Sequence, residues 1–241
     1  MSHLETPTLK VPVQQEAARW VDQCIESRRS IHRFLDTPVD EREVHDLLRV
    51  ASRAPSGTNI QPWRVYALSG DAKNRLCEAM LKAHHECPGE HDYGYKYYPD
   101  KMFGPYAERQ LGYWERFWGT HGVPKSDEVS SRAVIAQNYS FFGAPVALLF
   151  TIDSGLEKGS WFDYGIFAGN IMTAARARGL DTCPQVSVSK YHKVIREVVG
   201  VSAGETVICG MALGHADPSA RINTLVMNRE PVERFASFAG F

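Results

Sequence analysis

The stretch SRRSIHRFLDTPV, residues 27–39, gathers three arginines and a histidine near the N-terminus. Arg28, Arg29 and Ser30 combine two guanidinium forks with a hydroxyl group, a donor set that matches the oxygens of a phosphate. Taken alone, an Arg-Arg-Ser tripeptide is more often a solvated basic turn. Other stretches of the chain must decide between these two interpretations.

A second candidate is the stretch APSGTNIQPW, residues 54–63, which contains two prolines and a glycine. Its restricted backbone around Pro55 could present amides and the small side chains of Ser56 and Asn59 to a flat ligand. Ser56 does not lie in a GxSxG motif, so we do not expect a hydrolase nucleophile here. On its own, the stretch is more typical of a structural loop.

Residues 93–118 contain ten of the 26 aromatic side chains in about a tenth of the chain. Rings at this density suit stacking and edge contacts on a planar aromatic acceptor. A self-packed cap or a subunit interface is the alternative. The candidates for substrate contact are Tyr98, Phe103, Tyr106, Tyr113, Trp114 and Phe117. The basic residues that could meet a carboxylate of the acceptor are Lys96, Lys101, Arg109 and Arg116.

Several other site chemistries find little support. The stretch HHECPGEH, residues 84–91, has zinc-ligand residue types but no common zinc spacing, so no metal is predicted. Cys183 has no evident partner histidine, which disfavours a nucleophilic thiol. The chain lacks the GxGxxG and GxxxxGK[ST] motifs of Rossmann dinucleotide sites and P-loops.

Charge and hydropathy disfavour further classes of protein. A formal net charge of −1 argues against a nucleic-acid partner. No apolar run approaches the roughly 18 residues of a membrane-spanning helix, and the N-terminal stretch has no signal-type apolar core. Five cysteines without a CxxC pair suit free thiols in a reducing compartment. We therefore expect a cytoplasmic protein that binds neither membrane nor nucleic acid.

The elements that position these candidates can be read from periodicity, caps and breakers. Helices are predicted over about residues 14–27, 40–54, 71–82, 107–118, 128–142, 161–179 and 189–200, and strands over about 64–70, 144–153 and 205–214. Helices and strands do not alternate strictly, which predicts an α+β fold with helices covering a mixed sheet. We expect one domain, 1–241, with an aromatic-rich insertion over 84–126 and a polar, extended tail over 215–241.

Six stretches, in this order, resemble the nitroreductase family of FMN-binding flavoproteins. They are RRSIHRFLDTPV, ASRAPSGTNIQPWRVY, NYSFFGAPV, ARARGLDTCPQ, VVGVSAGETVICGMALG and REPVERF. The resemblance runs from about residue 14 to the C-terminus and is weakest over 84–120. The insertion is most similar in form to that of members acting on nitrobenzoates and related nitroaromatics. A nitroreductase-like fold with a central mixed or antiparallel sheet is implied.

The resemblance also implies a binding site for non-covalent FMN. Arg28, Arg29 and Ser30 stand where family members hold the phosphate, the ribityl chain and the pyrimidine end. Pro55 and Ser56 match a loop that contacts the ring and the ribityl hydroxyls. The further cofactor-binding residues implied in this way are Asn59, Asn138, Pro184, Gln185, Val186, Ser187 and Arg229.

Some of these matches carry specific roles. The backbone of Gln185, Val186 and Ser187 matches a segment whose amides approach flavin N5 and O4, where weak donors suffice. Arg229 matches a tail arginine that closes on the phosphate. Asn138 could reach the edge of the cofactor, although a helix cap or a core hydrogen bond is an equal alternative.

His32 departs from the family pattern, in which an arginine or lysine faces the N1–O2 edge of the flavin. A permanent cation there stabilises negative charge on the reduced ring. A histidine with a pKa near 6.5 supplies that charge only partly at neutral pH. We therefore expect the flavin potential to depend more strongly on pH than in relatives with arginine.

The resemblance finally implies an activity and an assembly. The implied reaction is ping-pong reduction of a nitroaromatic compound, in which NAD(P)H delivers hydride to flavin N5 and the acceptor then takes the electrons. The implied assembly is a homodimer, with FMN at the interface, the tail embracing the partner, and the helix bearing Gly165 and Gly169 in the dimer core. Alternatives on the same fold are reduction of quinones, enones or free flavin, and reductive dehalogenation. A flavin-binding protein without turnover is an alternative of another class.

Overall fold

The centre of the molecule is a four-stranded sheet. In spatial order its strands are β1 (Arg64–Ser69), β2 (Val146–Asp153), β4 (Glu205–Gly214) and β3 (Asp181–Gln185). The computed structural model describes residues 14–87 and 89–241. All three strand pairs are antiparallel. The middle strands β2 and β4 are largely buried, as their apolar runs predict.

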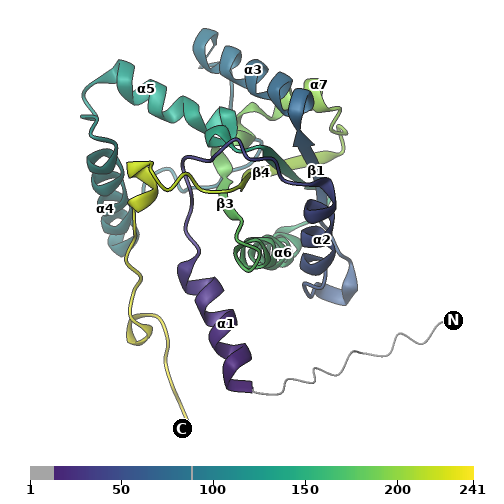
Figure 1. Ribbon diagram of the computed structural model, residues 1–241, viewed down its shortest axis with the longest axis vertical. Coiled ribbons are helices and arrows are strands. Elements are labelled where there is room, and N and C mark those ends of the chain that lie inside the picture. The colour runs from purple at the N-terminus through teal and green to yellow at the C-terminus, as the bar shows by residue number, and fades with distance from the viewer. Residues whose placement is uncertain (1–13, 88) are drawn as a thin grey trace, which may run out of the picture.

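Helices cover both faces of this sheet (Figure 1). One layer consists of α2 (Glu41–Ala51) and α6 (Lys158–Arg176), and the other of α3 (Gly70–Glu86) and α7 (His192–Val199). Leu148 and Phe150 of β2 share a core with the first layer. Ala147 and Leu149 share a core with the second layer, as the two-residue period of a strand requires. The predicted α+β class is therefore confirmed.

Capping interactions explain where these helices begin and end. The Asp40 carboxylate accepts a hydrogen bond from the backbone N–H of Arg42 at 2.7 Å and begins α2. Beyond α6, Gly179 adopts a left-handed φ of 72°. The N–H of Leu180 then donates to the carbonyl of Ala175 at 3.0 Å, the long-range bond of a Schellman motif. The predicted helix stop at Gly179 thus has a clear physical basis.

The aromatic-rich insertion over 84–126 contains helix α4 (Gly104–His121), and α5 (Glu128–Ala136) follows directly after it. The helix predicted over 107–118 lies within α4, and α3 extends four residues beyond its predicted end. Phe117, Val134 and Ile222 form a small third core that joins both helices to the tail. Helix α4 is therefore anchored through a few apolar contacts at one end, while Tyr95 fixes the first part of the insertion to β4 through its bond to the Ile208 carbonyl.

The remaining elements are helix α1 (Gln14–Ser27) and short 3-10 helices: η1 (Gly57–Asn59), η2 (Gln137–Gly143), η3 (Val186–Tyr191), η4 (Arg221–Thr224) and η5 (Val232–Arg234). Helix α1 and the end of the tail project from the body on the same side (Figure 1). Large apolar side chains exposed on these two segments are Trp20, Val21, Ile25, Phe235, Phe238 and Phe241. The tail, which was predicted to be polar, therefore exposes three phenylalanine side chains.

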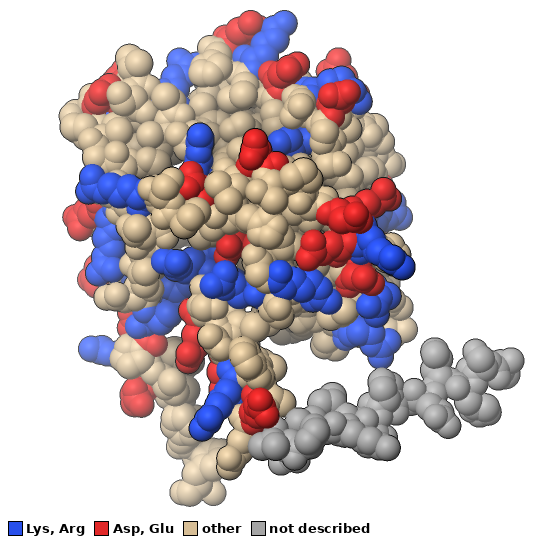
Figure 2. Space-filling model, viewed as in Figure 1, with Lys and Arg blue, Asp and Glu red and all other residues tan. Residues whose placement is uncertain are grey.

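The surface carries charges of both signs. On the face shown in Figure 2, basic and acidic side chains are interspersed, which agrees with the net charge of −1. No helix in the described part of the chain combines the length and apolar character that crossing a membrane needs. All five cysteines are free thiols.

Candidate active site

The segment that follows α1 is fixed beside β3 by backbone bonds and by two core side chains. The Ile31 N–H donates to the Thr182 carbonyl at 3.1 Å, and Ser30 forms a parallel bridge with Thr182. Ile31 and Phe34 are buried in the core. Successive residues of an extended chain point to opposite sides. Because Ile31 points into the core, Arg28, Ser30 and His32 lie on the other side of this segment.

Arg28 and the tail residue Arg229 lie within electrostatic reach of each other. The pKa of Arg28 is lowered, first by burial and then by the positive charge of Arg229. Two like charges brought together over about 200 residues of sequence are unfavourable unless an anion lies between them. This pairing is the feature of the site that best fits a phosphate. Arg29 is exposed to solvent.

Helix α4 holds the tail at the position of Arg229. Arg116 donates from Nη1 to the Val226 carbonyl and to Asn228 Oδ1, both at 3.3 Å. Arg109 lies 3.4 Å from the Glu230 carboxylate. The insertion and the tail thus form one unit that delivers Arg229 to the segment after α1.

The end of β3 and the start of η3 are supported by Asn138. Gln185, with 3% of its surface exposed, donates from Nε2 to the Asn138 carbonyl at 2.7 Å. Ser187 Oγ donates to Asn138 Oδ1 at 2.9 Å. Val186 begins η3, and the first N–H groups of such a helix have no intrahelical acceptor. The side chains of Gln185 and Ser187 are thus turned onto Asn138, at the point where η3 begins.

We refer to Arg28, Ser30, His32, Asn138 and residues 184–187 as the cradle. Cys183, beside it, is 3% exposed, and burial raises the pKa of its thiol to about 12. The Ser30 hydroxyl and the Arg28 charge oppose this rise only partly. The thiol therefore stays protonated at neutral pH, in agreement with the expectation that it is not a nucleophile.

His32 lies at the far end of the cradle from the Arg28–Arg229 pair. The backbone N–H of His32 donates to Asn223 Oδ1 at 2.9 Å. The His32 ring packs edge-on against Phe142, with ring centres 4.7 Å apart, and against Phe117 at 5.8 Å. Burial, with a smaller contribution from His121, lowers the pKa of His32 to about 4. The ring is therefore uncharged near neutral pH, rather than partly charged as expected from its sequence position.

The loop with Pro55, Ser56 and Asn59 lies elsewhere in the chain. Its backbone is strained, because Thr58, Asn59 and Gln61 have φ values of 48°, 61° and 47°. The Gly57 N–H donates to the Asp163 carboxylate of α6 at 3.0 Å.

The residues that flank this loop belong to the core layer of α2 and α6. The core residues around the cradle belong to the opposite layer. Within the described residues, the hydrogen bonds and ion pairs do not join the loop to the cradle. One chain therefore does not assemble all of the predicted cofactor-binding residues.

The predicted substrate residues fall into two groups. Tyr113, Trp114 and Phe117 form a ring cluster on α4, in which Tyr113 stacks on Phe117 at 5.7 Å. Phe117 of this cluster packs against His32 at 5.8 Å, so the cluster borders the cradle. Burial raises the pKa of Tyr113 to about 12. By contrast, Phe103 and Tyr106 pair with each other, Tyr98 pairs with Tyr97, and these three predicted residues are mostly exposed.

Three of the four basic residues proposed to meet a carboxylate have other partners. Lys96 lies 2.8 Å from Asp100, and Arg109 and Arg116 hold the tail. The sequence could not indicate the tail partners of Arg109 and Arg116, because both contacts span more than 100 residues. The structure therefore favours other cations for an acidic substrate group.

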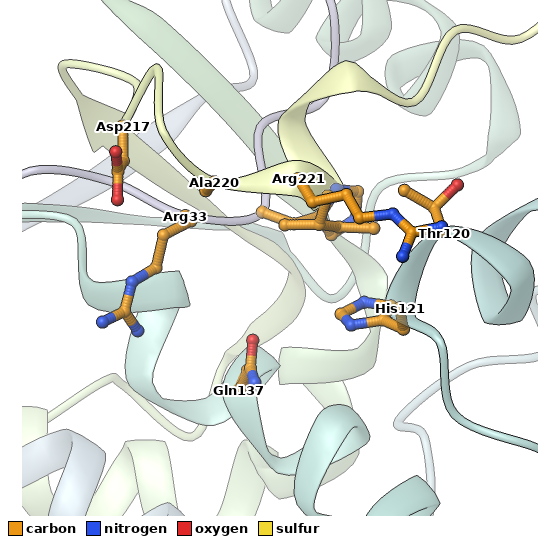
Figure 3. Close-up of a pocket in the computed structure, with 9 residues that line it drawn as sticks. Arg33, Thr120, His121, Gln137, Asp217, Ala220 and Arg221 are labelled. Atoms are coloured by element: carbon orange, nitrogen blue, oxygen red, sulfur yellow. The ribbon is translucent and has the colours of Figure 1, made fainter.

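A cavity of about 280 Å³ lies at the His32 end of the cradle (Figure 3). Its polar lining includes His32, Arg33, His121, Gln137, Asp217 and Arg221. The sequence patterns indicated only the first of these as a site residue. Gln137, beside the predicted Asn138, is the one that proximity to a motif could have suggested.

The segment that carries His32 and Arg33 is also held by Asn223. This buried side chain donates from Nδ2 to the carbonyls of Arg33 at 2.7 Å and Asp217 at 2.9 Å. No sequence pattern marks an isolated asparagine in the tail. Its role arises only when the tail folds back onto the first segment.

The histidine-rich stretch does not form a metal site in the described part of the chain. No group of three potential ligand side chains comes together there. His84 Nδ1 instead lies 3.0 Å from the Tyr191 hydroxyl, in a packed cluster with Tyr139.

Comparison with known proteins decides the family. The sequence model of the nitroreductase family matches residues 25–215. The chain belongs to the nitroreductase family. The predicted recognition and the predicted oxidoreductase class are thereby confirmed.

Curated relatives of this nitroreductase include enzymes named for nitroaromatic substrates. It is 40% identical over 220 residues to 4-nitrobenzoate reductase of Pseudomonas putida, covering 91% of this chain and 96% of the relative. It is 39% identical over 219 residues to chloronitrobenzene nitroreductase of Comamonas testosteroni, with the same coverage.

Solved structures of the family share its fold. The FMN- and NADPH-dependent nitroreductase NfnB from "sphigopyxis" sp. strain HMH superposes with a TM-score of 0.88 at 29% identity. The FMN-dependent NfnB from Mycobacterium smegmatis, in complex with NADPH, also has a TM-score of 0.88, at 27% identity. Each comparison covers 92% of this nitroreductase and 99% of the solved chain.

Proposed function

We propose that this nitroreductase binds FMN without a covalent bond in the cradle and uses NAD(P)H to reduce nitroaromatic compounds. The observation that carries the proposal is the pairing of the segment that bears Arg28 and Ser30 with β3, whose end continues into residues 184–187. Arg229 of the tail lies within electrostatic reach of Arg28. A dianionic phosphate would neutralise the two guanidinium groups. When bound, the flavin would supply ping-pong transfer of electrons through N5, from the nicotinamide to the nitro group.

The residues of this chain would bind and orient rather than exchange protons. Arg28 and Arg229 would hold the phosphate, with Arg29 at the entrance, and Ser30 would face the ribityl chain. The backbone of residues 184–187 would donate to the ring, and Asn138 would keep that backbone in place. The neutral ring of His32 would border the pyrimidine end.

A homodimer would complete this site. An added Cβ at Gly165 or Gly169 of α6 would meet open space, so the close packing expected there has no counterpart within the chain. Phe162 of the same helix is 73% exposed. A second chain covering α6, α1 and the tail over 215–241 would bury these apolar side chains.

Such a dimer would also account for the separated loop. Pro55, Ser56 and Asn59 would reach the FMN of the partner subunit rather than that of their own chain. The strained backbone of the loop is typical of segments whose conformation serves a ligand. The insertion over 84–126 would then act as a substrate cap, with the rings of Tyr113, Trp114 and Phe117 against the acceptor. The other predicted cap residues, Tyr98, Phe103 and Tyr106, would line its outer part.

We propose a reducing compartment such as the cytoplasm for this protein. The five free cysteines, including the buried Cys183 and Cys77, support this proposal.

The decisive experiment mixes purified yellow protein with NADH or NADPH without oxygen and follows the flavin absorbance. We expect bleaching, and then recovery of the colour on addition of a nitroarene. A colourless dimer that stays colourless after soaking with FMN would overturn the proposal. Bleaching without recovery would instead favour a panel of quinones, enones, free flavin and halophenols as acceptors. Coloured protein that does not bleach with either nicotinamide would indicate a passive flavin-binding protein.

A further inference from the structure

The cavity beyond His32 is lined by hydrogen-bond donors that have no role in the proposed FMN site. Figure 3 shows Arg221, Thr120 and His121 on one side of it, Arg33 and Asp217 on the other, and Gln137 below. Neither Arg28 nor Arg229 lines it, so it is distinct from the place proposed for the FMN phosphate.

We propose that this cavity binds an oxyanion group, a carboxylate or a phosphate, carried by one of the substrates of the enzyme. The inference rests on the proposed function and assigns a substrate-recognition site next to it. Its cations are Arg33 and Arg221, and its neutral donors are Gln137, Thr120 and His121.

Arg221 is the cation best placed for this role. Its guanidinium makes a single long hydrogen bond, from Nη2 to the Gly119 carbonyl at 3.4 Å. Among the described residues it has no ion pair. An arginine has five N–H donors, so most of its hydrogen-bonding capacity remains for a ligand. A planar fork of this kind matches the two oxygens of a carboxylate or a phosphate.

The carboxylate of Asp217 does not cancel this positive character. Its Oδ1 accepts from the N–H of Ser219 at 2.8 Å and from the Ser219 hydroxyl at 2.6 Å. These bonds, followed by the charge of Arg33, lower the pKa of Asp217, so it remains ionised. Asp217 therefore offsets Arg33 and leaves the charge of Arg221 uncompensated.

The position of the cavity relates it to an aromatic substrate. Phe117 packs against His121 at 4.5 Å and against His32 at 5.8 Å, so one ring of the α4 cluster separates the two histidines. An aromatic acid whose ring lies against this cluster could extend its carboxylate toward Arg221. The phosphate of a nicotinamide dinucleotide is the other source of the same chemistry.

A purely structural role for Arg221 is the competing explanation. Its contact with Gly119 lies near the C-terminal end of α4, where a cation stabilises the helix dipole. Such a role predicts a change in stability on substitution but no selective change in anion binding. The test must therefore compare an anion with its neutral analogue.

The test measures binding of benzoate, benzamide, NADP⁺ and NAD⁺ to the FMN-loaded protein by isothermal titration calorimetry. The variants are Arg221→Gln and Arg33→Gln. The matched control is Arg75→Gln, on the exposed surface of α3. We expect Arg221→Gln to weaken the binding of an anion by about tenfold, because a charge-assisted bond is lost. We expect a smaller effect of Arg33→Gln and none of Arg75→Gln.

Each outcome has a defined meaning. Weaker binding of benzoate but not of benzamide identifies the carboxylate of an acceptor as the ligand. Weaker binding of NADP⁺ but not of NAD⁺ identifies the 2′-phosphate as the ligand, and equal weakening of NADP⁺ and NAD⁺ identifies their shared pyrophosphate. Weakening of both benzoate and a dinucleotide identifies one site used by the two substrates in turn. The inference would be overturned if each of the four compounds bound to Arg221→Gln as tightly as to the unmodified protein. If Arg221→Gln does not fold, the same comparison with Arg33→Gln decides.

Failure of the proposed function would look different. Protein that never retains FMN would refute the flavoenzyme, while benzoate titration of that protein would still test the cavity. Conversely, suppose that Arg221→Gln reduces nitrobenzene normally and binds the anions with unchanged affinity. The proposed enzymatic function would then stand, and the proposed anion site would be refuted.

Discussion

The cradle and the cap of this nitroreductase border the same site but are built in different ways. The cradle is fixed by hydrogen bonds in or next to the main core: the backbone of Ile31 bonds to β3, and the side chains of Gln185 and Ser187 bond to Asn138. The cap rests on side chains of α4, which are held by a small core and by one exposed ion pair and two long hydrogen bonds to the tail. Exposed ion pairs contribute little stability.

This difference has a functional meaning. A cofactor that is the same in every turnover needs a fixed frame, and backbone bonds to a buried strand provide one. An acceptor that differs between related enzymes needs a surface that can change, and side chains on a weakly anchored helix provide it. The sequence resemblance is accordingly weakest in the insertion and strongest around the cradle.

The largest effect should come from the buried ring of α4 that lies in the small core. Phe117 is 4% exposed, whereas Phe103 is 62% exposed. Replacing Phe117 with alanine should cost about 3 kcal/mol, since a buried ring leaves a cavity. Phe103→Ala should cost no more than about 0.5 kcal/mol. Chemical denaturation of both variants measures the difference, and equal costs would show that the small core does not hold the cap.

Acid should weaken the junction between cap and cradle. The pKa of His32 is about 4 in the folded chain, against 6.5 ordinarily. Between these values the unfolded chain binds the proton more readily, so stability is full above about pH 6.5 and falls as pH drops toward 4. The loss from His32 should be at most about 3 kcal/mol. His121 and His84, whose pKa values burial also lowers, act in the same direction.

Urea unfolding of FMN-free protein at pH 7 and pH 4.5 checks this prediction. His32→Gln should flatten the pH dependence, because glutamine does not titrate. A variant whose stability falls as steeply as that of the unmodified protein would assign the effect to other groups.

The two arginines proposed to hold the phosphate compare the cradle with the exposed tail. Arg28→Gln should raise the Kd of FMN about 30-fold, the loss expected for a partly buried charge-assisted bond. Arg229→Gln, on the exposed tail, should have a smaller effect of about fivefold. Quenching of FMN fluorescence on binding measures both constants. A larger effect of Arg229 would mean that the tail, not the cradle, dominates phosphate binding.

The smallest effect should come from the support of η3. Asn138→Ala removes the acceptor of the Ser187 hydroxyl and should cost about 1 kcal/mol of stability. Ser187→Ala removes the same bond from the other side. Because the two residues share one bond, the double variant should cost less than the sum of the single variants. Strict additivity would show that the bond contributes nothing.

Local patterns in the sequence predicted much of this molecule. Caps such as Asp40 and the glycine stop at Gly179 act over a few residues, so the helices they bound could be anticipated. The apolar runs of β2 and β4 predicted buried strands. The motif around Arg28 and Ser30 indicated one wall of the candidate site. The sheet order and its antiparallel pairing did not follow from these local signals.

The sequence by itself determined which residue types are present and which short elements they form, because helix and strand periods depend on near neighbours. Only the tertiary structure decided that His32 is neutral, that Arg109 and Arg116 bind the tail, and that Arg221 faces a cavity. Those outcomes depend on burial and on partners more than 100 residues away, such as Asn223 for His32. No local pattern encodes such contacts, since they exist only once the chain has folded back on itself.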